Sequence, residues 1–197
     1  PNDDVNMSQS SNDVIPTAIK VRAHMDLTKK LLPALDKLIE ITDNKANSLK
    51  GLVKTGRTHL MDAMPLDFHQ EISAWTSQLK NSKKTFLFLE KRMLEMPLGG
   101  TAVGTGINAH PRFPKLFAKE LNKLSGGRWK NVPSENFFHE LSAQDTAVQV
   151  SGELKNLAII LLKISNDLRW MNSGPLAGLS EIELQALQPG SSIMPGK

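Results

Sequence analysis

Two long apolar repeats constrain the fold of this chain more than any other feature of its sequence. In each repeat, mostly apolar side chains recur at alternating spacings of four and three residues over more than three heptads. Side chains at this spacing share one face of an α-helix, so each repeat predicts a long helix that packs against other helices. The first repeat comprises Phe68, Ile72, Trp75, Leu79, Ser82, Phe86, Leu89 and Met93, and the second comprises Val150, Leu154, Leu157, Leu161, Ile164, Leu168 and Met171.

The remaining sequence indicates further helices, separated by loops rich in glycine and proline. We expect the first helix to be capped by Asn12 or Asp13 and to be kinked or broken at Pro33. No internal repeat and no convincing strand is found, so the predicted fold is all-α, a bundle of very long helices. Such helices bury more apolar surface than one chain of 197 residues can cover, which predicts packing against other subunits. The predicted helices cover residues 14–50, 65–95, 111–124 and 139–172.

Composition and charge exclude several classes of protein. The chain contains no cysteine, which rules out disulfides and favours a reducing compartment, and we expect a cytoplasmic protein, or a mitochondrial one in a eukaryote. No apolar run reaches the roughly 18 residues needed to span a bilayer. The net charge of +4 comes with lysines scattered along helices and only 5% aromatic residues. This pattern is typical of a solvated basic face, and neither nucleic acid nor a membrane is an expected partner.

The last residues of the chain, GSSIMPGK, form a predicted binding loop. Gly190 and Gly196 allow close backbone approach to a ligand, while Ser191, Ser192 and Lys197 supply hydroxyl groups and a positive charge. This set of groups suits a carboxylate or a phosphate. A Gly- and Ser-rich surface loop without function is the alternative interpretation, and the glycine spacing does not match a nucleotide-binding P-loop.

Two further groups of polar residues are candidate sites. Ser10, Ser11 and Asn12 lie where the first helix begins, and unpaired backbone N–H groups at a helix N-terminus favour an anion. Plain capping of the helix is the alternative. Residues 56–65 are predicted to form a loop in which His59, beside Thr58, could act as a general acid or base, although a surface histidine has the same pattern.

The segment 97–110 is unusually rich in glycine. The glycines of this segment indicate close backbone approach to a ligand or to another chain. They do not indicate a dinucleotide site, because no predicted strand precedes them. The other histidines are interpreted as structural, and they are His24, His69, His110 and His139.

Taken together, the loops resemble the successive motifs of the fumarase/aspartase superfamily, and most closely those of class II fumarate hydratases. The motifs are PNDDVNMSQSSND, GRTHLMDAMPL, GGTAVGTGIN and SGPLAGL followed by PGSSIMPGK. Two residues favour fumarate hydratase over aspartate ammonia-lyase: His59, where aspartases usually carry Gln, and Gly196, where they usually carry Ala. Three residues depart from the common pattern: Asp4, where His is more frequent, Met61, where Gln is common, and Leu176, where Arg is common.

The resemblance implies reversible hydration of fumarate to L-malate through an aci-carboxylate intermediate, with no cofactor and no metal. It also implies a homotetramer in which loops of three subunits form each active site. Residues 1–197 would be the central helical domain of a longer enzyme, without its N- and C-terminal regions, and would be inactive alone. Alternatives are an aspartate ammonia-lyase, and a helical oligomerisation module that binds dicarboxylates without turnover. The implied roles are Ser191 as the base, His59 acting through a water, Ser10, Ser11, Asn12, Thr58, Ser192 and Lys197 as substrate ligands, and Asn2 and Asp3 in a second dicarboxylate site.

Overall fold

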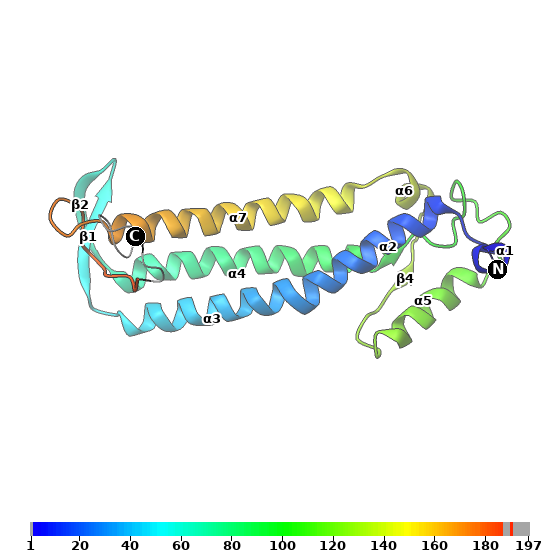
Figure 1. Cartoon of the computed structure of the whole chain (residues 1–197), viewed down its shortest axis with the longest axis horizontal. Helices are drawn as coiled ribbons and strands as arrows, with labels where there is room; N and C mark the ends of the chain where they lie inside the picture. The colour runs from blue at the N-terminus through cyan, green and yellow to red at the C-terminus, as the bar shows by residue number, and fades with distance from the viewer. Residues whose placement is uncertain (1, 187–189, 191–197) are drawn as a thin grey trace. The chain divides into compact units, whose positions relative to one another are not determined.

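The computed structural model describes residues 2–186 and residue 190, and most of them are helical (Figure 1). This confirms the predicted predominance of long helices. The two longest, α4 and α7, have 26 and 27 residues and carry the two apolar repeats. The helices are α1 (Asn2–Asn6), α2 (Ser11–Asp26), α3 (Leu32–Ser48), α4 (Phe68–Met93), α5 (Phe113–Leu124), α6 (Phe137–Ser142) and α7 (Asp145–Met171).

Several predicted boundaries were wrong. The single helix expected over 139–172 is divided into α6 and α7, because Ala143 adopts an extended conformation at the end of α6. The helix expected from residue 65 begins at Phe68 instead, since Pro65 belongs to a strand. The N-cap of α2 is Ser10, not Asn12 or Asp13.

The predicted kink near Pro33 takes the form of a π-helical segment, Leu27–Leu31, between α2 and α3. The backbone N–H of Leu32 donates to the carbonyl of Leu27, five residues back rather than four. Proline has no N–H to donate, so a wider turn immediately before Pro33 accommodates it without ending the helix. As a result, Leu27 and Leu32, five residues apart, are both buried.

Four strands occur where none was expected. β1 (Val53–Thr58) and β2 (Met61–Asp67) form an antiparallel hairpin, and β3 (Glu95–Met96) pairs in parallel with β4 (Val132–Pro133). The hairpin replaces the loop predicted for residues 56–65. A half-buried strand is recognised in a sequence by the alternation of apolar and polar residues. The strands of this hairpin are mostly exposed, so they lack that alternation.

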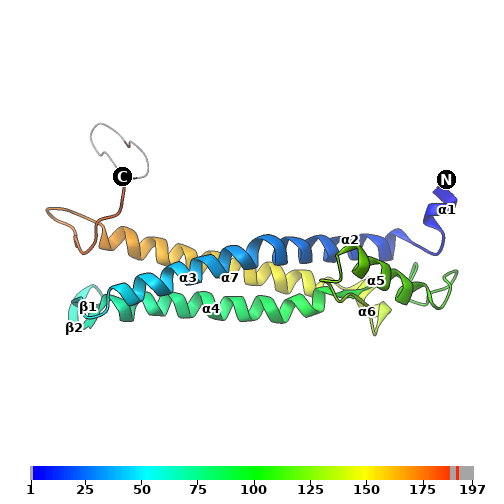
Figure 2. The same ribbon diagram turned by 90° about the horizontal axis from the view of Figure 1, so that it is seen from below.

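The chain divides into two compact units, and the first comprises residues 2–41 and 79–155. Within it, α6 contacts α2, and α5 lies beside β4 (Figure 2). The ammonium group of Lys20 on α2 pairs with the buried Glu140 on α6 and donates to the carbonyls of Arg92 and Glu95, just where α4 ends. Lys20 therefore satisfies the carbonyl of Arg92, which lies in the last turn of α4 and has no partner inside the helix, and that of Glu95 in β3.

The second unit comprises residues 42–78, 156–186 and 190. Its core contains Ala46 of α3, Ile72 and Trp75 of α4, and Met171 of α7, each less than a tenth exposed. Ile182, beyond α7, packs against the same core. The indole N–H of Trp75 donates to Asp167 at 3.1 Å, so the polar edge of this large side chain is satisfied.

The two apolar repeats differ in burial. Seven of the eight predicted positions on α4 are at most 6% exposed, among them Leu79 and Phe86 at 0%, which confirms the first repeat as a core face. On α7, Leu157 and Met171 are buried, but Leu154 and Leu161 are 46% and 39% exposed, so this chain alone does not cover the second repeat. Ile159, Leu162 and Trp170 are more than half exposed as well. Helix α7 is thus apolar on several sides.

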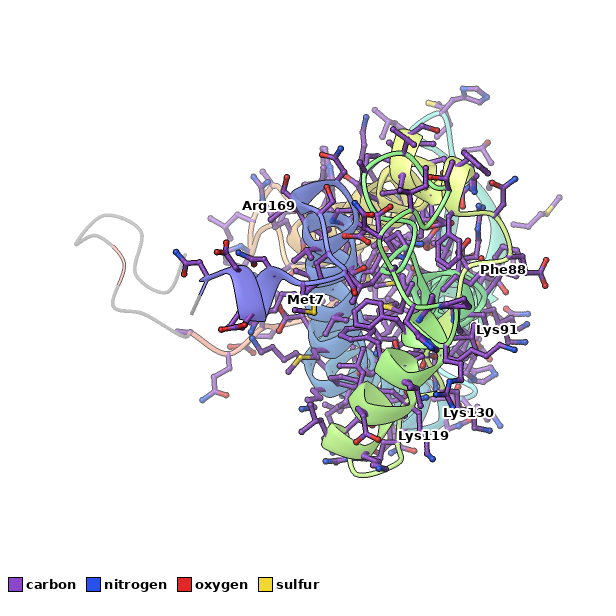
Figure 3. All side chains as sticks on the ribbon, turned by 90° about the vertical axis from the view of Figure 1, so that its right-hand side faces the viewer. Met7, Phe88, Lys91, Lys119, Lys130 and Arg169 are labelled. Carbon is purple, nitrogen blue, oxygen red and sulfur yellow. The ribbon has the colours of Figure 1, made fainter. Side chains whose placement is uncertain are left out.

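One side of the first unit carries several exposed lysines. Lys91, Lys119 and Lys130 are exposed, on the same side as the exposed Phe88 (Figure 3). Among the residues that the structure describes, no helix is both long and apolar enough to cross a membrane.

Candidate active site

The start of α2 is the most completely built of the predicted sites. Ser10 has an extended backbone, and its hydroxyl oxygen accepts the N–H of Asn12 at 3.2 Å. The carboxylate of Asp13 accepts the N–H of Ser10 at 2.9 Å, which completes a reciprocal capping box. Ser11 and Asn12 occupy the first turn and are exposed. Capping therefore uses the Ser10 oxygen, while the Ser11 hydroxyl faces solvent at the positive end of the helix.

Asp13 also joins this helix start to the glycine-rich loop. Its side chain is 0% exposed, and the second carboxylate oxygen accepts the N–H groups of Gly99 at 3.0 Å and Thr101 at 2.9 Å. Thr101 has a φ of 57°, a left-handed conformation that is unusual for a β-branched residue. The side-chain amide of Asn12 donates to the carbonyl of Ala102 at 2.9 Å. One buried carboxylate thus fixes the loop against the residues predicted to bind an anion.

The glycines of this loop allow close contacts inside the unit. A Cβ on Gly99 would lie 2.2 Å from a ring carbon of Pro114, and one on Gly104 would lie 2.8 Å from the ring of Phe138. We expected the close approach to be to a ligand or to another chain, but these contacts are with α5 and α6. Between the loop and the helix start is a hollow of about 370 Å³, within the usual size range of small-molecule sites. It is lined by Ser8, Gln9, Ser10, Thr101, Ala102, Val103, Thr105, Ile107 and Asn108.

The β1–β2 hairpin carries Thr58 and His59. Thr58 pairs with Met61, and the two residues between them, His59 and Leu60, have φ values of 52° and 64°. Positive φ at both central positions is the signature of a type I′ turn. His59 is therefore at the exposed tip of a hairpin rather than within a loop.

Four charged side chains hold the base of this hairpin. The ammonium group of Lys54 lies 2.5 Å from a carboxylate oxygen of Glu71 and 2.6 Å from one of Glu181. The guanidinium group of Arg57 donates to the other oxygen of Glu181 at 2.6 Å. The side chains of Lys54 and Glu181 are only 7% and 10% exposed. We call Lys54, Arg57, Glu71 and Glu181 the charged cluster; it joins β1, the first turn of α4 and the segment after α7 (Figure 1).

The charged cluster shifts the pKa values of its members. Burial alone would lower the pKa of Lys54, but its ion pairs with Glu181 and Glu71 outweigh burial and raise it. Burial alone would raise the pKa of Glu181, but Lys54 and Arg57 outweigh burial and lower it. The hydrogen bond to Glu181 raises the pKa of Arg57. All three groups are therefore held in their charged forms.

These shifts predict how the stability of the protein depends on pH. A carboxylate whose pKa is lowered by folding stabilises the fold above its unfolded pKa, and this contribution is lost as the pH falls through the folded value. We therefore expect the thermal midpoint of the wild-type protein to exceed that of Glu181→Gln at neutral pH, and the difference to shrink below about pH 4. Lys54, whose pKa is raised, keeps its contribution until the pH rises above about 10. A difference that stays constant from pH 7 to pH 3 would contradict the ion pairing.

The predicted site residues are distributed over both units. Ser10, Ser11 and Asn12 belong to the first unit, as do the exposed Asn2 and Asp3 on α1; Thr58 and His59 belong to the second. Ser191, Ser192 and Lys197 lie outside the described residues. Within residues 2–186 and at residue 190, no group of three histidine or carboxylate side chains is placed to hold a metal ion.

Sequence reasoning missed three residues that organise these sites: Asp13, Lys54 and Glu181. Asp13 was considered only as a helix cap, although the Ser-x-x-Asp spacing from Ser10 to Asp13 is the local sign of a capping box. Its second role, toward Gly99 and Thr101, has no local sign in the sequence. The same is true of the pairing between Lys54 and Glu181.

Comparison with known proteins gives consistent matches along the whole chain. The profile of a protein family described as "Lyase" matches residues 1–197. The chain is 53% identical over 197 residues to "Fumarate hydratase class II 2" of Pseudomonas aeruginosa, covering 100% of this chain and 43% of that protein. It is 54% identical over 197 residues to "Fumarate hydratase class II" of Xylella fastidiosa, covering 100% of this chain and 41% of that protein.

A solved structure agrees with these matches. The recombinant class II fumarase from Schistosoma mansoni matches with a TM-score of 0.91 and 38% identity, over 100% of this chain and 44% of that one. The chain spans about two fifths of the length of the curated relatives that it matches.

Proposed function

This chain belongs to the lyase family, and from that membership we propose that it is the central helical part of a class II fumarate hydratase. The enzyme would interconvert fumarate and L-malate, in the cytoplasm as the lack of cysteine favours. The observation that carries the proposal is the identity of 53–54%, along the entire chain, to proteins named as class II fumarate hydratases. The hydroxyl and amide groups at the start of α2 support it, because they suit a substrate carboxylate.

The chemistry demands a base and a dense set of hydrogen-bond donors. Removal of a proton next to the carboxylate of malate produces an aci-carboxylate, which carries an additional negative charge. We assign the base to Ser191, activated by backbone N–H groups of its glycine-containing loop and by a nearby cation. Ser192 and Lys197 would bind the substrate carboxylates together with Ser10, Ser11, Asn12 and Thr58. His59 would act on the departing hydroxyl group through a water molecule.

The proposed enzyme is a homotetramer with active sites shared between subunits. The exposed apolar residues of α7, such as Ile159, Leu162 and Trp170, support this assembly, since an unpaired apolar helix face gains free energy when another helix covers it. If each active site is built from loops of different subunits, its residues are expected to lie on separate elements of one chain. Asn2 and Asp3, on the exposed α1, would belong to a second dicarboxylate site.

The test is a spectrophotometric assay of the full-length protein. We expect absorbance of fumarate to rise after L-malate is added, with no release of fumarate from L-aspartate. Release of fumarate from aspartate alone would reassign the protein to the ammonia-lyases of the same family. If neither substrate is converted while fumarate still binds, the chain is a dicarboxylate-binding helical module without this activity.

A further inference from the structure

The charged cluster is placed where it could control the hairpin tip. Arg57 directly precedes Thr58 in the chain, and Lys54 lies three residues before Arg57 on the same strand. Both cations reach the same carboxylate, that of Glu181, and each uses a different oxygen. Glu181 is thus bonded to β1 at two positions, of which one is next to the residues assigned to catalysis. The hairpin cannot tilt without breaking at least one of these pairs.

Glu181 itself is fixed by its backbone. Its N–H donates to the carbonyl of Met171 at 2.8 Å, and the N–H of Ser180 donates to that of Ser173 at 2.7 Å. The next residue, Ile182, packs its side chain into the core of the second unit. The segment after α7 is therefore folded back onto the end of that helix, and it carries the Glu181 side chain to the hairpin. Glu181 is a rigid anchor, not a mobile surface carboxylate.

Because two of its side chains are nearly buried, the charged cluster is sensitive to the loss of any one of its charged groups. Lys54 and Glu181 are nearly buried, and removing one partner of a buried pair leaves the other charge uncompensated. Lys54 would retain Glu71, whereas the ion pair left to Arg57 among the described residues is a longer one, to the exposed Asp62 at 4.0 Å. An unpaired Arg57 would turn toward water and move the adjoining backbone of the tip.

We propose that Glu181 is a positioning residue for the hydration reaction: through Arg57 and Lys54 it holds Thr58 and His59 in their working orientation. This proposal rests on the function proposed above. Glu181 would touch neither substrate nor reacting atoms.

Glu181→Gln in the full-length protein tests this inference, because it keeps the shape of the side chain and removes its charge. We expect kcat per folded protein to fall about ten- to a hundredfold, the loss typical of a misplaced catalytic group, with KM changed less than about threefold. Amide hydrogen exchange of peptides containing residues 57–61 should become faster, whereas that of peptides in the middle of α7 should not change. Arg57→Lys, which retains the charge but not the forked geometry, should change both measurements in the same direction.

Two controls separate positioning from stability. Asp167→Asn weakens the hydrogen bond to the buried Trp75 in the same unit, so it lowers the thermal midpoint without touching the hairpin. Asp62→Asn removes the exposed carboxylate near Arg57. Both variants should retain wild-type kcat and wild-type exchange at residues 57–61.

Each outcome bears on a different statement. Unchanged exchange at residues 57–61 in both Glu181→Gln and Arg57→Lys would overturn the anchoring role. Faster exchange with unchanged kcat would overturn the link to catalysis. If the wild-type protein converts neither malate nor aspartate but the exchange result holds, the proposed function fails while the anchoring of the tip stands.

Discussion

Replacing Ser191 with alanine in the full-length protein is expected to lower kcat for malate dehydration by about 10²–10⁴-fold, the range associated with the loss of a general base. The substitution removes one oxygen atom and leaves the other proposed carboxylate ligands in place. KM should therefore change much less than kcat, because the lost interaction belongs to the transition state. Steady-state kinetics with malate and with fumarate measure both constants. Since the equilibrium constant fixes the ratio of the two kcat/KM values, kcat/KM should fall by the same factor in both directions.

Ser165→Ala is the matched control. Ser165 lies on α7, and its exposed hydroxyl donates to the carbonyl of Leu161 within the same helix. Its replacement should leave kcat unchanged. A Ser191→Ala protein with wild-type kcat would remove Ser191 as the base and would require another group to take the proton.

The largest loss of stability is expected at Asp13. Asp13→Ala removes the acceptor of three backbone N–H groups, those of Ser10, Gly99 and Thr101, from a site that is 0% exposed. The bonds from Gly99 and Thr101 are buried, and each buried donor left without a partner costs about 1–3 kcal/mol, so the free energy of unfolding should fall by at least about 2 kcal/mol. Thr101, whose left-handed backbone depends on that hydrogen bond, should relax as well. Denaturant titration of the full-length protein measures the change.

Asp26→Ala on the same helix is the control for Asp13. Asp26 forms exposed ion pairs with Arg22 and Lys30, and pairs of this kind contribute little to stability. The prediction is contradicted if Asp13→Ala and Asp26→Ala unfold at the same denaturant concentration. Water would then replace the Asp13 carboxylate without lowering the free energy of unfolding.

The helices could be predicted from the sequence where the apolar pattern coincides with a face buried inside one chain. This holds for α4, whose repeat is buried from Ile72 to Met93. For α7 the same spacing also predicts the helix, but Leu154 and Leu161 remain exposed in the single chain. Spacing reports that a face is apolar and not which molecule covers it.

The hairpin could not be predicted, because its turn lacks the residues that such turns favour. A type I′ turn prefers Asn-Gly, whereas this chain has His59 and Leu60 at positive φ. Gly56 and Pro65 also interrupt the strands, and both residues weaken a strand pattern. A tip that departs from these preferences is consistent with a histidine retained for a purpose other than stability.

Only those parts of the candidate site that depend on neighbouring residues in the sequence could be predicted. The polar start of α2 follows from capping rules, and the structure confirms its place at the helix N-terminus. The contact from Asp13 to Gly99 spans 86 residues, and that from Arg57 to Glu181 spans 124. Contacts between residues so far apart in the sequence depend on the fold of the whole chain, so no short sequence motif predicts them.

The π-helical turn at Leu27–Leu31 determines the direction in which the side chains of α3 face relative to those of α2. Each residue of an α-helix turns the chain by about 100°, and one extra residue in a turn would displace all later side chains by that angle. The π turn contains one residue more than an α-helical turn. Because the N–H of Leu32 donates to the carbonyl of Leu27, side chains that are five residues apart lie on one face of the helix. Homologues that differ by one residue within 28–30 could therefore keep both flanking helices in register. In this long run of helix, a change of one residue at the π turn is therefore expected to disturb the flanking helices less than a change elsewhere.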